Sequence, residues 1–430
     1  MQQASKVMYN VHYSNGVYKM NSTGDTSGLM PIHYAKQLIQ KAISPISEVV
    51  LCDLNACLDR IIAHDIVSPI NVPAYDNSAM DGYALKYDSF VAGETLRQVG
   101  KSFAGAKFEG QLKAGECVRI MTGAEIPKGA DTVVMQENAR VDGKQITFHS
   151  VTKGDAIRRA GYDIKQGATV LQAGTRINPV DIGLLASLGI NEVDVYRQLC
   201  VAVFTTGDEL LAPGQTQRND RIFDSNRPML IAMLSRLGAR VIDLGIIADN
   251  KAKILAAFEH ANQYADCVIT TGGVSVGEAD YTREVLAQYG SIDFWKLAIK
   301  PGKPLAFGRL SNSIFFGLPG NPVSAAVTFD KIAAPALAYL AGSRSFTAVT
   351  LQGVAIRDFK KRPGRTDYQR AHYFVNDAGV VSVEPSGSQS SGVLSCFRKS
   401  NCYAVFESDT GNVLKGEPVQ VQPFSHIISE

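Results

Sequence analysis

The chain has 430 residues, which is longer than one ordinary domain, so about two to four domains are expected. Apolar residues make up 45% and charged residues 20%, as in soluble globular proteins. Lys and Arg number 43 against 41 for Asp and Glu. This balance excludes a broad basic surface for nucleic acid or anionic membranes, so any anion binding must be local. No run approaches the ~20 apolar residues that span a bilayer.

The N-terminal segment and the cysteines indicate a cytoplasmic protein. Residues 1–28 are polar and lack the apolar centre of a secretory signal, so they are expected to form a disordered extension. The seven cysteines are scattered without a C-x-x-C pair. A disulfide framework and a structural zinc site are therefore not expected, and a reducing compartment fits best.

In chain order, the apolar residues of 31–43 recur at helical spacing, which predicts a helix, and residues 54–64 are also predicted to be helical. From 99 to 149 the sequence changes to short strands and turns, with a hairpin signal at Asp142-Gly143. A helix closed by Gly189 and then a strand lead to about residue 198. This part of the chain is predicted to contain a small β-rich unit between segments of mixed structure.

Residues 199–341 alternate apolar strand-like runs with helical segments. This pattern predicts a parallel, doubly wound α/β domain. Residues 346–430 are again strand-like segments separated by Gly, Asp and Ser turns, which predict a small closed β domain such as a barrel.

Ligands of open α/β sheets bind outside the carboxyl ends of the strands. Glycines 272, 273 and 277 follow one such end and would let backbone N–H groups turn toward an anion, although a plain Gly-rich turn is the alternative. After the last strand, Asn321 is placed as a helix N-cap with Pro322 at the first helical position.

Three acids, Glu209, Asp249 and Asp280, follow different strands of this predicted sheet. Mg²⁺ prefers one or two carboxylates together with phosphate oxygens, so the acids suit Mg²⁺ on a substrate phosphate. For Asp249 and Asp280, helix capping is the alternative. Lys296 and Lys300 lie four apart on a predicted strand, on one face and ~13 Å apart at ~3.3 Å per residue. Lys300 and Lys303 are placed where an oxyanion could reach them, with solvated surface charge as the alternative.

Two further regions are rich in turn formers and polar groups. Residues 73–84 and 121–124 look like functional loops. Near the C-terminus Arg365, Asp367 and Arg370 precede a Ser/Gly loop over 386–392, where exposed salt bridges are the alternative. The histidines share no spacing that would support a His-based catalytic set.

These loops together resemble the molybdopterin molybdenumtransferase family, which includes the cofactor-making domain of gephyrin. The matching stretches are DNSAMDGYA (76–84), SFAG (102–105), RIMTGA (119–124), ADTVVMQE (130–137), TTGDEL (205–210), DSNR (224–227), TTGGVSVGEADYT (270–282), FWKLAIKPGKP (294–304), GLPGNPVSA (317–325) and PGRTDYQR (363–370). They run in one order over residues 30–430, so only the N-terminal extension lies outside the resemblance.

The resemblance implies an elongated homodimer whose active sites join the inserted domain of one subunit to the α/β and last domains of the other. The implied domains are a discontinuous N-terminal dimerisation domain (29–70 and 151–198), an inserted β-rich domain (71–150), an α/β molybdopterin-binding domain (199–345) and a C-terminal β domain (346–430). The implied reaction takes adenylylated molybdopterin and molybdate, with Mg²⁺, to molybdenum cofactor and AMP. Implied partners are the molybdopterin adenylyltransferase and cofactor-delivery proteins.

The family's site residues carry over motif by motif. Those expected to act in catalysis are Asp249, Asp280, Lys296 and Lys300, with Glu209, Asp249 and Asp280 as Mg²⁺ ligands. Those expected to bind substrate are Asp81, Thr122, Asp163, Glu209, Gly272, Gly273, Ser275, Pro319, Pro322, Arg370 and Ser391, with Ser390 as the alternative to Ser391. Two competing functions are a non-catalytic scaffold and a phosphohydrolase with a related α/β domain. The intact acids and lysines argue against the first, and the flanking motifs argue against the second.

Overall fold

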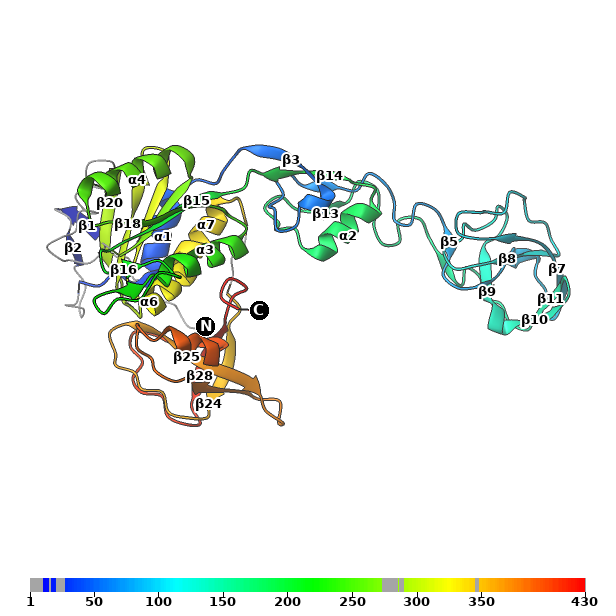
Figure 1. Ribbon diagram of the computed structural model, residues 1–430. Coiled ribbons are helices and arrows are strands. Elements are labelled where there is room, and N and C mark those ends of the chain that lie inside the picture. The colour runs from blue at the N-terminus through cyan, green and yellow to red at the C-terminus, as the bar shows by residue number, and fades with distance from the viewer. Residues whose placement is uncertain are drawn as a thin grey trace. The chain divides into compact units, whose positions relative to one another are not determined.

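The computed structural model describes residues 11–14, 17–20, 28–272, 285, 290–344 and 348–429. The chain forms two compact units (Figure 1). The first comprises Met1–Val50 and Tyr196–Glu430, and the second comprises Leu51–Val195.

The first unit is built around a six-stranded sheet of order β18-β15-β19-β23-β22-β20. Its strands are β15 (Cys200–Thr206), β18 (Arg240–Ile247), β19 (Cys267–Thr271), β20 (Gly290–Lys296), β22 (Pro304–Leu310) and β23 (Ile314–Leu318). The first four strands in spatial order are parallel, whereas β22 is antiparallel to both of its neighbours. Strand β22 was not predicted from the sequence. It contains Pro304 and Gly308, and both residue types are typical of loops.

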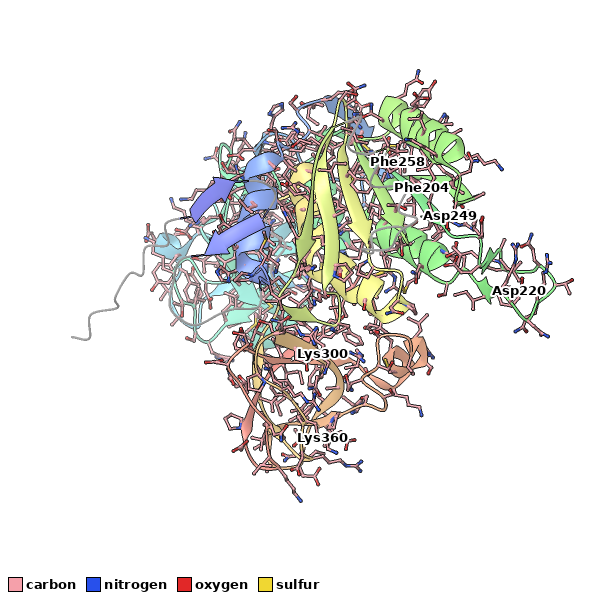
Figure 2. The ribbon with its side chains drawn as sticks, turned by 90° about the vertical axis from the view of Figure 1, so that its left-hand side faces the viewer. Phe204, Asp220, Asp249, Phe258, Lys300 and Lys360 are labelled. Carbon is pink, nitrogen blue, oxygen red and sulfur yellow. The ribbon has the colours of Figure 1, made fainter. Side chains whose placement is uncertain are left out.

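Helices cover both faces of this sheet, which confirms the doubly wound α/β fold. On one face, Val201 and Val203 pack with residues of α3 (Asn226–Leu237) and of the helical segment α6–α7. On the other, Phe204 contacts Phe258 of α4 (Lys251–Tyr264) edge-to-face, with ring centroids 5.1 Å apart (Figure 2). Successive residues of a strand point to opposite faces, so these apolar runs supply both layers.

The helices begin and end at the positions expected from their sequences. Gly238 ends α3 with φ 87°, a conformation that favours glycine. The segment α6 (Pro322–Thr328), a π-helical turn (Phe329–Ala333) and α7 (Ala334–Leu340) run on from the N-cap Asn321. Pro322–Leu340 is long and apolar enough to cross a membrane, but 89% of its most apolar stretch is buried in the protein, as in a core helix.

The C-terminal strands close into a five-stranded barrel, as predicted. They are β24 (Leu351–Ala355), β25 (Thr366–Val375), β26 (Val381–Pro385), β27 (Cys402–Phe406) and β28 (Pro418–Pro423). Their order is β25-β26-β24-β28-β27, and β27 pairs with β25 to close the ring. The short strand β21 (Ile299–Lys300), which follows β20, pairs in parallel with the start of β25. The α/β part and the barrel are thus joined by backbone hydrogen bonds.

The second unit contains a six-stranded sheet of order β10-β11-β7-β8-β6-β9. Its strands are β6 (Gly82–Leu85), β7 (Thr95–Ser102), β8 (Glu116–Ile120), β9 (Thr132–Met135), β10 (Ala139–Asp142) and β11 (Gln145–Phe148). Asp142 pairs with Gln145, which confirms the predicted hairpin. This part of the chain also contains helix α2 (Pro179–Ser187) and three two-stranded sheets, formed by β12 (Ile157–Arg158) and β5 (Asn77–Ser78), by β13 (Thr169–Leu171) and β4 (Ile66–Val67), and by β14 (Glu192–Tyr196) and β3 (Val49–Asp53).

The helical prediction for 54–64 is wrong. Only Leu54–Ala56 form a short 3-10 turn, and Asp59 has φ 63°. Ile61 and Ile62 instead make β-bridges to Arg176 and Val195. Pairing with distant backbone outweighs the weak local helical preference here.

At the N-terminus, α1 (Ile32–Ala42) packs with the core of the first unit, in contact with α7. The sequence had assigned these residues to the N-terminal domain, and the predicted domain boundaries remain predictions. Within the segment predicted to be disordered, β1 (Val11–Ser14) and β2 (Val17–Met20) pair as an antiparallel hairpin, so that prediction is not met there.

Candidate functional site

The candidate site begins where the carboxyl ends of β15 and β19 lie side by side. In spatial order β18 and β19 flank β15, so the chain crosses from one side of β15 to the other at this point. Gly272 follows β19 with φ 88°, and a Cβ there would lie 2.6 Å from the carbonyl oxygen of Thr206. Only glycine therefore allows the two strand ends to pack this closely.

Asn226, the first residue of α3, ties these strand ends together. Its Nδ2 donates to Thr271 Oγ1 at 2.8 Å and to the carbonyl of Gly320 at 2.7 Å. The Thr271 hydroxyl in turn donates to the carbonyl of Pro319 at 2.9 Å. The loop that contains Pro319 and Pro322 is thereby held against the end of β19. No role was predicted for Asn226 from the sequence, although its place in the DSNR motif (224–227) was an available signal.

Acidic side chains gather at the same edge of the sheet. Burial raises the pKa of Asp249, and the nearby charges of Asp208 and Glu209 raise it further. The Asp249 N–H also donates to Asp208 Oδ1 at 3.3 Å. The N-cap of α4 is Asn250, whose side chain accepts from Ala252 and Lys253, so capping does not account for Asp249. No role was predicted for Asp208 from the sequence, although it directly precedes Glu209 in TTGDEL (205–210).

The described residues contain no group of three or more His, Cys, Asp or Glu side chains arranged to hold a metal ion. Asp280, the third predicted ligand, lies outside the described residues, as do Gly273 and Ser275. Mg²⁺ commonly takes one or two carboxylates and completes its shell with water and phosphate oxygens. The pair Asp249 and Glu209 therefore fits a cation brought with a phosphate, rather than one enclosed by protein.

The structure corrects the predicted geometry of the lysines. Lys296 ends β20 and is exposed, whereas Lys300 lies on the separate strand β21. The strand is interrupted because the N–H groups of Leu297 and Ala298 bond the carbonyls of Lys303 and Met30. Lys296 and Lys300 therefore do not share one face of one strand.

Lys300 is held at the junction between the α/β part and the barrel (Figure 2). Its Nζ lies 3.3 Å from Oδ2 of Asp367, whose side chain is 4% exposed. The same oxygen accepts from Gln369 Nε2 at 3.2 Å. A second lysine, Lys361, is close by: burial lowers its pKa, and the Asp367 charge partly offsets this. The ion pair of this segment thus joins a buried carboxylate, Asp367, to Lys300, whose side chain is 42% exposed.

Arg370 is 1% exposed and lies beneath the serine-rich loop. Its Nη2 donates to the carbonyls of Ser388 and Ser390, each at 3.4 Å. No carboxylate forms an ion pair with it among the described residues. Because side chains alternate along β25, Arg370 and Asp367 point to opposite faces of that strand. The structure thus gives no contact between Lys300 and Arg370, and direct contact of an anion with Arg370 requires the loop to shift.

The two candidate serines differ in their surroundings. Ser390 is exposed, and its Oγ accepts from the N–H of Gly392 at 3.5 Å. Ser391 is half-buried, and its carbonyl accepts from the N–H of Val323 in α6 at 3.1 Å. The backbone of Ser391 therefore anchors the loop, while both hydroxyls remain candidates.

In the second unit, the structure brings Asp81 and Thr122 together. Asp81 Oδ1 accepts from the Thr122 N–H at 2.8 Å and from its hydroxyl at 2.7 Å. These bonds lower the pKa of Asp81, so its charged form is favoured. Asp163 is exposed, and its N–H donates to the carbonyl of Val72 at 3.0 Å.

A cavity of about 750 Å³ lies elsewhere in the first unit. Its walls include Lys36 and Ile39 of α1, Lys331 of the π-helical turn and Phe424 after β28. None of the predicted site residues lines it. The candidate site is therefore defined by the strand ends and the barrel junction.

Three family models match consecutive parts of the chain. The MoeA N-terminal region (domain I and II) matches residues 30–189, the probable molybdopterin binding domain 202–339, and the MoeA C-terminal region (domain IV) 352–424. A molybdopterin molybdenumtransferase from Haemophilus influenzae is 48% identical over 380 residues, covering 87% of this chain and 94% of the relative. The chain belongs to the molybdopterin molybdenumtransferase family.

Other relatives of this family agree. A molybdopterin molybdenumtransferase from a Nostoc species is 33% identical, covering 86% of this chain and 88% of the relative. The crystal structure of a molybdopterin biosynthesis MoeA protein from Pyrococcus horikoshii superposes with a TM-score of 0.79 at 29% identity. It covers 92% of this chain and 100% of its own. The family resemblance seen in the sequence and the multidomain fold are thus confirmed.

The acid cluster predicts a stability change with a defined pH dependence. Because the pKa of Asp249 is raised in the folded protein, ionisation of this side chain lowers the free energy of unfolding. The loss of stability is absent at pH values below 3.8, the ordinary pKa of an aspartate, and it is complete once the pH exceeds the raised pKa. Asp208→Asn removes one repelling charge and keeps an oxygen that accepts the Asp249 N–H. At pH 7 we expect the Tm to rise by about 1–3 °C, and this gain to vanish near pH 3.

Differential scanning calorimetry across this pH range measures the effect. Asp220→Asn is the matched control (Figure 2). Asp220 is exposed, and its ion pair with Arg218 is long, at 3.9 Å, so the same substitution there should change the Tm little. An Asp208→Asn Tm at or below that of wild type at pH 7 would contradict the repulsion.

Proposed function

We propose that the protein is a molybdopterin molybdenumtransferase, which combines adenylylated molybdopterin with molybdate and releases AMP to form molybdenum cofactor. The observation that carries this proposal is the match of three consecutive family models between residues 30 and 424, together with an acidic edge on the α/β sheet. A transferase that handles an adenylate and an oxyanion needs both a cation site for phosphate and positive groups for the oxyanion.

Asp249 and Glu209, with Asp280, would hold Mg²⁺ against the adenylate phosphate. Burial and the charges of Asp208 and Glu209 together raise the pKa of Asp249, and a cation at this edge would offset the repulsion among the three acids. When bound, Mg²⁺ would withdraw charge from the phosphate and make AMP a better leaving group. The glycines at 272 and 273, Ser275 and the loop of Pro319 and Pro322 would cradle the substrate at the strand ends.

Lys296, Lys300, Arg370 and the hydroxyl of Ser391 or Ser390 would bind molybdate. Lys300 supports this role because only one of its three ammonium hydrogens is needed for Asp367, which leaves donors for an oxyanion. Arg370 contributes a buried positive charge without a carboxylate partner among the described residues. These residues are assigned by resemblance, and an anion that contacts both Lys300 and Arg370 would need the loop over Arg370 to shift.

The protein would act as a cytoplasmic homodimer, and it would exchange cofactor intermediates with the molybdopterin adenylyltransferase and with delivery proteins. All seven cysteines are free and buried, as suits a reducing compartment. Large apolar side chains are exposed around β3 and α2, notably Leu51 at 64% and Val180 at 79%. Such exposure fits a surface that is covered in an oligomer.

The function is tested by the requirements for AMP release. The full-length protein is incubated with adenylylated molybdopterin, and AMP is measured by chromatography. We expect release only when both molybdate and Mg²⁺ are present. Equal release in EDTA would remove the Mg²⁺ assignment, and release without molybdate would indicate a phosphohydrolase.

Lys300→Ala should raise the molybdate concentration for half-maximal AMP release by about tenfold or more, because a charge-assisted contact to the oxyanion is lost. Lys360→Ala is the control, since Lys360 is an exposed lysine of the barrel (Figure 2). If Lys300→Ala lowers the Tm and leaves the molybdate dependence unchanged, Lys300 is a structural partner of Asp367 only.

A mixing experiment tests the shared site of the proposed homodimer. The predicted residues divide between the units, with Asp81 and Thr122 in Leu51–Val195 and the lysines in the other unit. Asp81→Ala and Lys300→Ala are mixed and allowed to exchange subunits, and AMP release is measured at a molybdate concentration at which Lys300→Ala alone is nearly inactive. Each mixed dimer would have one intact site and one site with both substitutions. Random exchange makes about half of the dimers mixed, so activity should return to roughly a quarter of wild type. No recovery, with exchange shown by native mass spectrometry, would place both residues in one subunit's site.

A further inference from the structure

Gln389 makes an unusual pair of bonds to the backbone of Arg370. Strand β26 ends at Pro385, which pairs with Ala371, so Arg370 has no residue of β26 opposite it. The side-chain amide of Gln389 takes that place. Its Oε1 accepts from the Arg370 N–H at 2.9 Å, and its Nε2 donates to the Arg370 carbonyl at 2.9 Å. The amide therefore acts as one more step of the β-ladder.

The same amide closes the base of the serine-rich loop. Gln389 Nε2 also donates to the carbonyl of Ser386 at 3.2 Å, and the N–H of Ser386 donates to the Arg370 carbonyl at 3.0 Å. At its far end the loop is tied to α6 through the carbonyl of Ser391. The loop from Ser386 to Ser391 is thus fixed both to β25 and to the α/β part.

Beneath this loop lies a positive charge that is weakly compensated. The Arg370 guanidinium donates to carbonyls of the loop and of Tyr368 at 3.4 Å and to Cys396 Sγ at 3.3 Å. The carbonyl contacts are longer than ordinary hydrogen bonds, and no described carboxylate pairs with the guanidinium. A buried charge without a counter-charge is costly, and an anion near it lowers that cost. On the outer side of the loop, Ser388 and Ser390 are exposed.

We propose that Gln389 is a positioning residue for oxyanion binding. It holds the loop over Arg370, so that the exposed serines meet the anion with the guanidinium charge behind them. This inference rests on the proposed function in one respect, namely that the anion is molybdate. A residue that only stabilised the barrel would affect folding without changing the dependence on anion concentration.

Two substitutions separate these roles. Gln389→Met keeps the length of the side chain and removes both amide bonds. Gln389→Glu keeps an oxygen for the Arg370 N–H but adds a negative charge beside the loop. Molybdate binding to the full-length protein is measured by equilibrium dialysis with metal analysis, and AMP release is measured over a range of molybdate concentrations. Gln352→Met is the control, since Gln352 is an exposed glutamine on β24.

We expect Gln389→Met to weaken molybdate binding and raise its half-saturating concentration about tenfold, with kcat at saturation close to wild type, as when buried hydrogen bonds that position a site are lost. Gln389→Glu should weaken binding further, because its charge repels the oxyanion. Gln352→Met should change neither quantity.

Three results would overturn the inference: unchanged molybdate binding in Gln389→Met, tighter binding in that variant, or equal effects of Met and Glu. Tighter binding would show that the loop obstructs the anion. If wild type releases no AMP yet binds molybdate, the proposed function fails while dialysis still decides the role of Gln389. If the wild-type protein binds no molybdate, the proposed function and the proposed role of Gln389 are both wrong.

Discussion

The close approach of β15 and β19 at their carboxyl ends is the constraint on which the rest of the site depends. Gly272 permits it, since a side chain there would collide with the carbonyl of Thr206. Asn226 then bonds Thr271 and Gly320, so that one buried amide sets the relative positions of three loops. A buried amide with two donors engaged is rigid, because breaking either bond would leave a polar group unsatisfied.

Charge of opposite sign is separated within the first unit. The acids Asp208, Glu209 and Asp249 share the edge of the sheet, and burial together with the charges of Asp208 and Glu209 raises the pKa of Asp249. Lys300 and Lys361 lie at the barrel junction around the carboxylate of Asp367, and Arg370 lies on the opposite face of β25. A substrate that carries both a metal-bound phosphate and an oxyanion would be oriented by such a distribution.

The short strand β21 links these two regions. It leaves the α/β sheet after β20 and pairs with the first residues of β25, where Lys300 lies opposite Asp367. The position of Lys300 is therefore decided jointly by the α/β part and the barrel. The loop from Ser386 to Ser391 has a similar dual attachment, through Gln389 to β25 and through Ser391 to α6. The residues proposed to bind an anion are thus held by backbone pairing and not by side-chain packing alone.

The sequence by itself determined the alternation of strands and helices in the α/β domain apart from β22, the barrel strands, the hairpin at Asp142-Gly143 and the family. Local periodicity and turn chemistry carry this information, because they depend on residues close in the chain. It also indicated Glu209, Asp249 and Lys300, since carboxyl ends of parallel strands meet at one edge.

Only the tertiary structure decided which residues meet across the chain. Residues 54–64 pair with distant backbone instead of forming a helix, and β22 joins the sheet antiparallel to its neighbours. Lys300 lies on a strand of its own beside Asp367, and Gln389 is bonded to the backbone of Arg370. Asp208 likewise contacts Asp249, and Asn226 bonds Thr271 and Gly320, only because the fold brings these distant segments together. Such contacts depend on the free energy of pairing and burial between distant segments, which no local pattern of residues records.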